Sequence, residues 1–106
     1  MISFRNPKLL KQASGDLCIE LTEEGNWESF PKFAEVLARQ IGATITERID
    51  GPDVRLWKIA YAGNALRLVY NDFPNGVSIE PSCSGQDAVI QKLFDSFMAQ
   101  ASPSGV

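Results

Sequence analysis

Alternating apolar and polar residues mark the middle of the chain, between residues 54 and 80. The runs 54–62, 65–71 and 76–80 each alternate, and the turn-forming segments Gly63-Asn64 and Pro74-Asn75-Gly76 separate them. Period-two alternation between turn residues is typical of half-buried strands. The pattern predicts an antiparallel β-meander, with a type II′ turn that has Gly63 at its first central position.

Two more strands and two helices are expected around this meander. Residues 17–22 alternate strictly, and residues 43–49 are rich in β-branched side chains, so both segments read as strands. Apolar residues at helical spacing predict one helix from about Trp27 or Pro31 to Ile41, ended by Gly42. Because Pro31 disfavours the helical conformation at Phe30, the alternative start at Pro31 would leave residues 27–30 as a separate turn. The same spacing predicts a second helix over about 86–100.

This order of elements, β-α-β-β-β-β-α, predicts an α+β fold. Each helix has a single apolar stripe, so we expect a mostly antiparallel five-stranded sheet with two helices packed on one face. Residues 17–101 are interpreted as one domain. Residues 1–16 are either an N-terminal arm or a short helix that begins at Asn6-Pro7, and residues 102–106 are expected to be a disordered tail.

Composition narrows the classes of function. The chain has 106 residues and a net charge of −3, and its Lys and Arg residues are scattered, which argues against nucleic acid as a partner. It contains neither a signal-peptide pattern nor an apolar run of membrane-spanning length, so we expect a cytoplasmic protein with no membrane partner. Cys18 and Cys83 lie far apart in sequence and are interpreted as free thiols, a disulfide being the alternative.

The amino-acid composition of the chain gives little support for a catalytic function. The chain has no histidine, which removes the commonest general base and metal ligand, and two separated cysteines cannot complete a zinc site. We therefore expect a protein that is not an enzyme and has no catalytic residue, metal or cofactor. The enzymatic alternative is a carboxylate-pair hydrolase, in which two carboxylates converge in a cleft. Its candidates are Glu20, Glu47, Asp53, Asp72 and Glu80.

A surface for binding another protein is the more concrete expectation. Two helices cannot cover both faces of a five-stranded sheet, so one face should be partly open. Aromatic and basic side chains from two meander strands are interpreted as lying on it, a composition typical of interface hot spots; these are Arg55, Trp57, Tyr61 and Arg67. The alternative places Trp57 and Tyr61 in the core. Asp72 and Phe73 in the last turn are further candidates, although Phe73 could instead pack on the core edge.

Several core-type motifs carry a family resemblance. They are Phe30-Pro31-x-Phe33-Ala34-Glu35-x-Leu37-Ala38, Ile41-Gly42-Ala43, Trp57, Leu66-x-Leu68-x-Tyr70 and Val77-Ser78-Ile79-Glu80. Over residues 17–100 the chain resembles a family of small uncharacterised gammaproteobacterial proteins, and it departs from the family pattern at residues 71–75. The resemblance implies no established activity and transfers no site residue. The expected architecture is also similar to that of bacterial immunity proteins and secretion chaperones.

The sequence thus favours a non-enzymatic protein-interaction module, with an immunity or adaptor role in the bacterial cytoplasm. Its partner would be another protein, and homodimerisation through a free sheet edge is a further expectation. A small-molecule-binding module is the alternative. Its pocket would lie between sheet and helices and be lined by Phe30, Phe33, Phe94 or Phe97.

Overall fold

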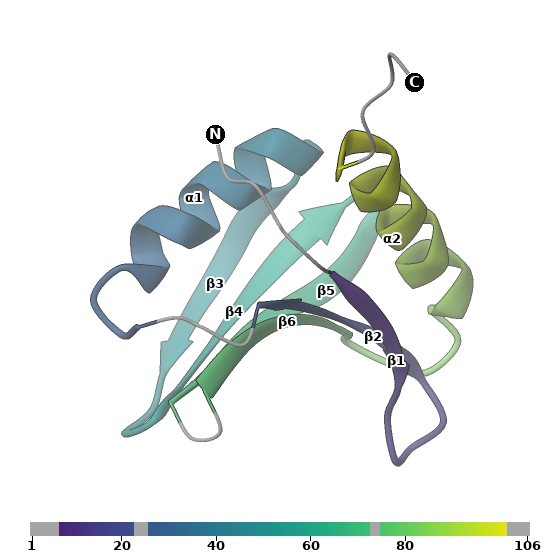
Figure 1. The fold of residues 1–106 in the computed structure, drawn as a ribbon. Coiled ribbons are helices and arrows are strands. Elements are labelled where there is room, and N and C mark those ends of the chain that lie inside the picture. Colours follow the sequence, from purple (N-terminus) through teal and green to yellow (C-terminus); the bar gives the residue numbers. More distant parts are fainter. Residues whose placement is uncertain (1–6, 23–25, 73–74, 102–106) are drawn as a thin grey trace.

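The computed structural model describes residues 7–22, 26–72 and 75–101. This part of the chain forms an antiparallel sheet and two helices, which confirms the α+β class (Figure 1). The elements in chain order are β1 (Lys8–Lys11), β2 (Leu17–Thr22), α1 (Phe30–Ile41), β3 (Thr44–Asp50), β4 (Val54–Tyr61), β5 (Asn64–Asp72), β6 (Asn75–Pro81) and α2 (Asp87–Ala101).

The strands lie in the order β1-β2-β6-β5-β4-β3, and every neighbouring pair is antiparallel. The predicted meander is present as β4, β5 and β6. Helix α1 connects β2 to β3, which lies at the far edge of the sheet, so the first half of the chain spans the width of the molecule. Strands β1 and β3 are the two edges.

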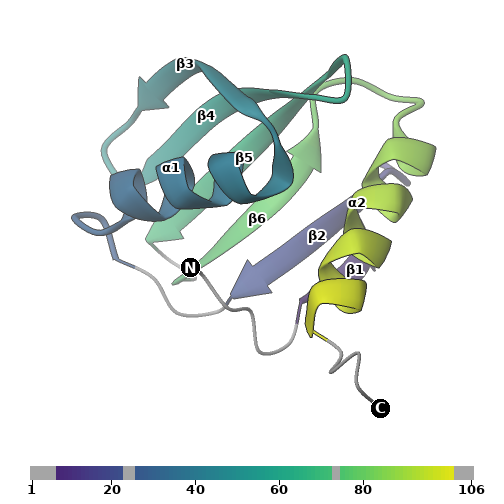
Figure 2. The same cartoon turned by 90° about the horizontal axis from the view of Figure 1, so that it is seen from above.

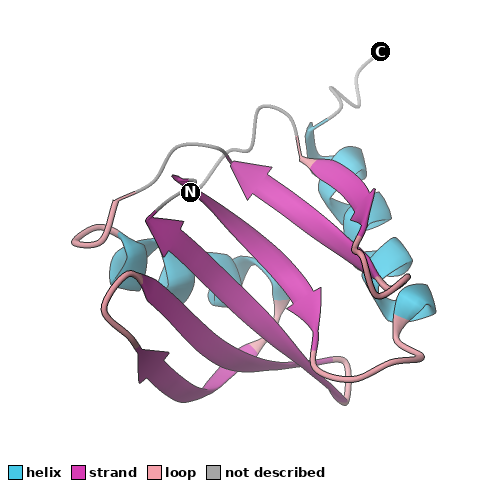
Figure 3. Ribbon diagram, turned by 90° about the horizontal axis from the view of Figure 1, so that it is seen from below, coloured by secondary structure: helices cyan, strands magenta, loops and turns pink. Residues whose placement is uncertain are grey.

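Both helices lie on the same face of the sheet, as the amphipathic patterns predicted (Figure 2). Helix α1 packs near β3, and α2 packs over β1, β2 and β6. Seen from the other side, the strands lie in front and the helices behind them (Figure 3). Apolar side chains from the sheet and both helices fill the space between these layers. The fully buried larger ones are Ile19, Leu21, Phe30, Leu37, Ile59, Leu66, Leu68, Tyr70, Ile79, Ile90, Leu93 and Phe97.

Helix α1 follows the sequence pattern closely. Its buried residues, Phe30, Ala34, Leu37 and Ala38, recur at the predicted helical spacing. The helix ends at Gly42, whose φ of 76° is in the left-handed region, and the C-cap backbone N–H groups donate to the carbonyl oxygens of Ala38 and Arg39. A residue without a Cβ adopts this conformation at least cost, which explains why the helix stops there.

The sheet has six strands rather than the five predicted. The additional strand is β1, where the sequence indicated an arm or a short helix. It pairs with β2, with Leu9 opposite Ile19 and Lys8 opposite Glu20. A four-residue strand is too short for its own pattern to identify it, and here the free edge of β2 decides its conformation. The expected tail 102–106 and the segment 1–6 lie outside the described residues.

The hairpin between β4 and β5 turns one residue earlier than predicted. Tyr61 pairs with Asn64, so the two turn residues are Ala62 and Gly63, with φ of 50° and 80°. Two consecutive positive φ values define a type I′ turn, and the prediction of a type II′ turn at Gly63-Asn64 is wrong. The corrected register pairs Ala60 with Ala65 and Lys58 with Arg67.

Candidate functional site

The sheet face that points away from both helices is the candidate site, and we call it the open face (Figure 3). Side chains alternate along each strand, so residues adjacent to the core positions of β2, β4, β5 and β6 belong to it. Strand pairing then places the residues of β1 and β3. Its main side chains are Lys8, Leu10, Cys18, Glu20, Glu47, Ile49, Val54, Leu56, Lys58, Ala60, Ala65, Arg67, Val69, Ser78 and Glu80.

The large apolar side chains at the two edges of the open face are exposed, whereas Val69 and Cys18 between them are buried. Leu10 on β1 and Ile49 on β3 are 42% and 44% exposed, whereas Val69 and Cys18 are 6% and 8% exposed. Only one other large hydrophobic residue in the described chain, Met98 on α2, is exposed to this degree. Leu10 and Ile49 therefore give the open face an accessible apolar side chain at each of its two edges.

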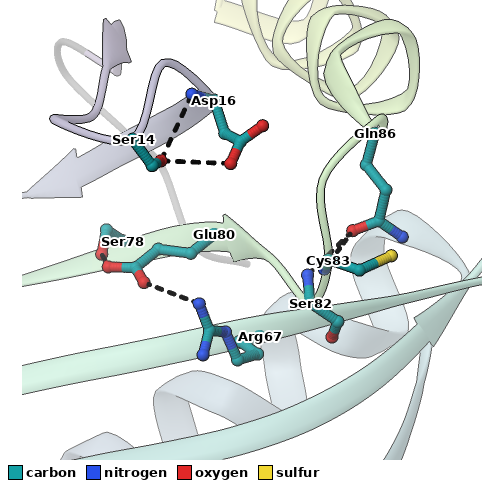
Figure 4. A network of polar contacts seen from close by, with 8 residues as sticks. All are labelled: Ser14, Asp16, Arg67, Ser78, Glu80, Ser82, Cys83 and Gln86. Carbon is teal, nitrogen blue, oxygen red and sulfur yellow. Dashed lines mark hydrogen bonds and ion pairs between the residues drawn. The ribbon is translucent and has the colours of Figure 1, made fainter.

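Each ion pair on the open face joins two neighbouring strands. Lys8 lies 3.9 Å from Glu20, Lys58 lies 3.4 Å from Glu47, and Arg67 lies 3.5 Å from Glu80. In Figure 4 the Arg67 guanidinium points toward the Glu80 carboxylate, which also accepts a hydrogen bond from Ser78. These partly exposed pairs contribute little to stability, about 0–1 kcal/mol each, but they fix a pattern of charge on the face.

The thiol of Cys18 lies beside two of these carboxylates. Burial raises its pKa, and the negative charges of Glu80 and Glu20 raise it further. A thiol is a nucleophile only as the thiolate, so this environment makes Cys18 unreactive. Both cysteines are free, Cys18 buried and Cys83 exposed, which confirms the interpretation of free thiols.

The prediction that Arg55, Trp57 and Tyr61 lie on an open face is wrong, because they face the helices. Trp57 is 2% exposed, and its ring meets the Phe30 ring edge-on at a centroid distance of 5.1 Å. Its Nε1–H donates to Asp50 Oδ1 at 2.9 Å. Tyr61 packs against the core. The alternative prediction, which placed Trp57 in the core, is therefore the one that agrees with the structure.

Arg55 is held in the same inner cluster. Its guanidinium carbon lies 3.9 Å from the centroid of the Trp27 ring, and its Nη1 lies 3.2 Å from Asp50 Oδ1. The remaining predicted basic residue, Arg67, pairs with Lys58 and so lies on the open face. The register thus separates Arg67 from the three residues that were grouped with it.

The turn between β5 and β6 holds the other predicted contacts. Asp72 is exposed and accepts a hydrogen bond from the Tyr70 hydroxyl at 2.9 Å, while Asn75 Nδ2 donates to the same hydroxyl at 3.3 Å. Burial and the Asp72 carboxylate raise the pKa of Tyr70. These hydrogen bonds tie the end of β5 and the start of β6 to the core residue Tyr70. Phe73 lies outside the described residues.

Four of the five carboxylates of the hydrolase hypothesis are engaged separately, and the fifth, Asp53, is exposed directly before β4. Glu20, Glu47 and Glu80 pair with three different cations, and Asp72 accepts from Tyr70. Within the described ranges, Cys, Asp and Glu do not gather in any group of three or more that could hold a metal ion. Neither described helix combines the length and apolar character needed to cross a membrane.

The phenylalanines of the pocket hypothesis belong to the core. Phe30 and Phe97 are 1% and 2% exposed, and Phe33 and Phe94 pack against the same cluster. Phe30 also contacts the Tyr70 ring at a centroid distance of 5.7 Å. These side chains therefore fill the interface between sheet and helices.

Gln86 is the buried polar residue of the described core, and its role is structural. Its Oε1 accepts from the backbone N–H groups of Ser82 and Cys83 (Figure 4). Its Nε2 donates to the Ala65 carbonyl at 2.9 Å. This amide joins the start of α2 to the β4–β5 hairpin. The first turn of α2 is also tied to β2, because Asp87 Oδ1 accepts from the Leu17 N–H at 3.0 Å.

Sequence reasoning missed the apolar residues of the open face, chiefly Leu10, Ile49, Leu56 and Val69. The signal was present in the alternation. Leu66, Leu68 and Tyr70 form the more apolar side of β5. Hairpin pairing aligns this side with Trp57 and Ile59, and therefore sends Leu56 and Val69 to the opposite face.

Residues 8–100 match the family described as "Protein of unknown function (DUF3630)". No curated protein matches the chain. No solved structure matches it either.

Proposed function

Because the chain belongs to the DUF3630 family, whose description assigns no function, we propose a role from its geometry: it is a non-enzymatic module that binds another protein through the open face. The observation that supports this is the distribution of exposed hydrophobic residues. Two of the three in the described chain, Leu10 and Ile49, lie at the edges of the face that the helices leave uncovered.

The sheet edges are less suited to binding than the face. Strand β1 has only four residues, two of which are lysines, and β3 has an irregularity between Ile45 and Glu47. Short strands, lysines and bulges all oppose the addition of another strand. Contact through side chains of the face, rather than through main-chain pairing, is therefore the mode we propose.

The setting that we propose is the bacterial cytoplasm, with an immunity or adaptor role. The net charge of −3 suits a basic partner, since complementary charge speeds association. The family resemblance to gammaproteobacterial proteins agrees with this setting. A toxin-like gene beside the gene for this chain would favour immunity in particular.

In-cell photo-crosslinking tests the proposal. A photoreactive phenylalanine analogue placed at Leu10 should yield adducts with another polypeptide in the native host. The matched control is the same group at Met98, which has nearly the same exposure, 44% against 42%, on the helical side. Adducts from position 10 that are absent from position 98 support the proposal. No adduct from position 10, or equal adducts from both positions, would contradict it.

A further inference from the structure

We propose that the open face over β3, β4 and β5 is self-complementary and binds a second copy of this chain. The proposal rests on the proposed function, since it names the occupant of one half of that face. The half formed by β1, β2 and β6, which includes Leu10, stays free for a different partner. The register of β3, β4 and β5 determines which side chains are neighbours on the proposed contact.

Two parallel rows of side chains cross these three strands. The first row is apolar: Ile49 pairs with Leu56, and Leu56 pairs with Val69. The second row is charged: Glu47 pairs with Lys58, and Lys58 pairs with Arg67. In both rows the middle residue belongs to β4, so β4 is the natural line of symmetry.

A two-fold axis parallel to β4 maps each row onto itself in reverse order. Leu56 then meets Leu56 of the second copy, and Ile49 meets Val69. In the charged row, Glu47 of each copy meets Arg67 of the other. Dimers of this kind present the same patch twice, and stacked sheets lie about 10 Å apart, a distance that these side chains span.

Of the outer residues, Ile49 and Arg67 are accessible for such contacts, whereas Val69, at 6% exposed, offers Ile49 only a small apolar surface. Ile49 is 44% exposed and would be covered by the second copy. The Arg67 side chain is 34% exposed and its Nη2 lies 3.5 Å from Glu80, so the guanidinium stays accessible to a second carboxylate. A carboxylate from a second chain would complete its ion pairing.

Lys58 is the one charge that meets its own copy on the axis. Its side chain is 45% exposed and lies 3.4 Å from Glu47, so a carboxylate of its own chain offsets the charge of each ammonium. Beyond Lys58, the next row is small, with Ala60 opposite Ala65. Small side chains there let the two sheets approach closely.

Charge reversal with mixing tests this dimer. Glu47→Arg places two cations at the contact, and Arg67→Glu places two anions there, so each variant alone should repel its own copy. In a mixture, the new arginine of one chain meets the new glutamate of the other, and attraction returns. Wild type should approach twice 11.7 kDa by sedimentation as its concentration rises, each variant should remain at 11.7 kDa, and their equimolar mixture should associate.

A second measurement does not depend on these variants. Leu56→Cys, in a Cys83→Ser background, should be joined between chains by a bismaleimide about 10 Å long, the spacing of stacked sheets. Met98→Cys in the same background should not be joined. A wild type that stays monomeric without Leu56→Cys cross-linking, or a mixture no more associated than its components, overturns the dimer. A monomer that still gives position-10 adducts overturns the dimer alone and leaves the proposed function standing.

Discussion

Replacing Trp57 tests whether this side chain is part of the core, as in the structure, or an exposed binding residue, as the sequence pattern predicted. The side chain is 2% exposed, packs edge-on against Phe30, and donates to Asp50 at 2.9 Å. The Arg48 guanidinium also lies 4.9 Å from its ring centroid. Trp57→Ala should therefore act on the fold.

The expected loss can be worked from these contacts. Truncating a buried tryptophan to alanine costs about 3–5 kcal/mol. A domain of this size is stable by about 5–15 kcal/mol, so much of the stability would be lost. At about 5 °C per kcal/mol, the melting temperature should fall by about 15–25 °C. Trp57→Phe keeps most of the packing but loses the bond to Asp50, and it should cost about 1–3 kcal/mol.

Urea unfolding followed by far-UV circular dichroism measures these changes, because it does not depend on tryptophan fluorescence. The matched control is Leu56→Ala, which truncates the neighbouring residue of the same strand on the open face. Leu56 is only partly buried, so its free energy of unfolding should fall by about 1 kcal/mol. Equal losses for Trp57→Ala and Leu56→Ala would refute the assignment of the two faces.

Further predictions concern the buried amide, the hairpin and the alkaline range. Gln86→Leu should cost about 2 kcal/mol in urea unfolding, because three partly buried hydrogen bonds to the backbone are lost. Gln91→Leu on the exposed side of α2 should change stability by less than about 0.5 kcal/mol. Ala62→Asn should raise the melting temperature by a few degrees, about 1 kcal/mol, because Asn tolerates the φ of 50° found there; an unchanged or lower value would contradict the turn assignment. Burial and two carboxylates raise the pKa of Cys18 in the folded chain above its usual 9.0. The unfolded chain therefore loses this proton at a lower pH than the folded chain. The free energy of unfolding should fall as the pH rises from about 9 toward the pKa of Cys18 in the folded chain. Cys18→Ala should flatten this loss in urea midpoints, leaving the part due to Tyr70, whose raised pKa acts above 10.0; an unchanged slope would contradict the assignment.

Local patterns predicted the elements well where one periodicity was clear. Residues 17–22 alternate strictly and form β2 with those bounds, and the apolar stripe that ends at Gly42 forms α1. Strand β1 was missed because Lys8–Lys11 is too short to show a period, and its conformation depends on pairing with β2.

The candidate site was harder to predict, because both sides of β4 carry large side chains. Composition alone favours Trp57 for an interface, but Trp57 lies opposite Leu68, and Leu68 is fully buried. Pairing between strands therefore decides which side faces the helices. If the predicted turn is displaced by one residue, each strand is still recognised from its own pattern. The pairing between the two strands then changes, and with it the residues that are neighbours on each face.

Binding affinity for the partner captured at position 10 tests the central claim most directly. The measurement compares wild type with Leu10→Lys on the open face and Met98→Lys on α2, two residues of nearly equal exposure. We expect Leu10→Lys to raise the dissociation constant by about tenfold or more, which corresponds to a loss of about 1.4 kcal/mol of binding free energy. Met98→Lys should leave the dissociation constant unchanged. Equal weakening by both variants, or weakening by Met98→Lys alone, would contradict the open face as the binding site.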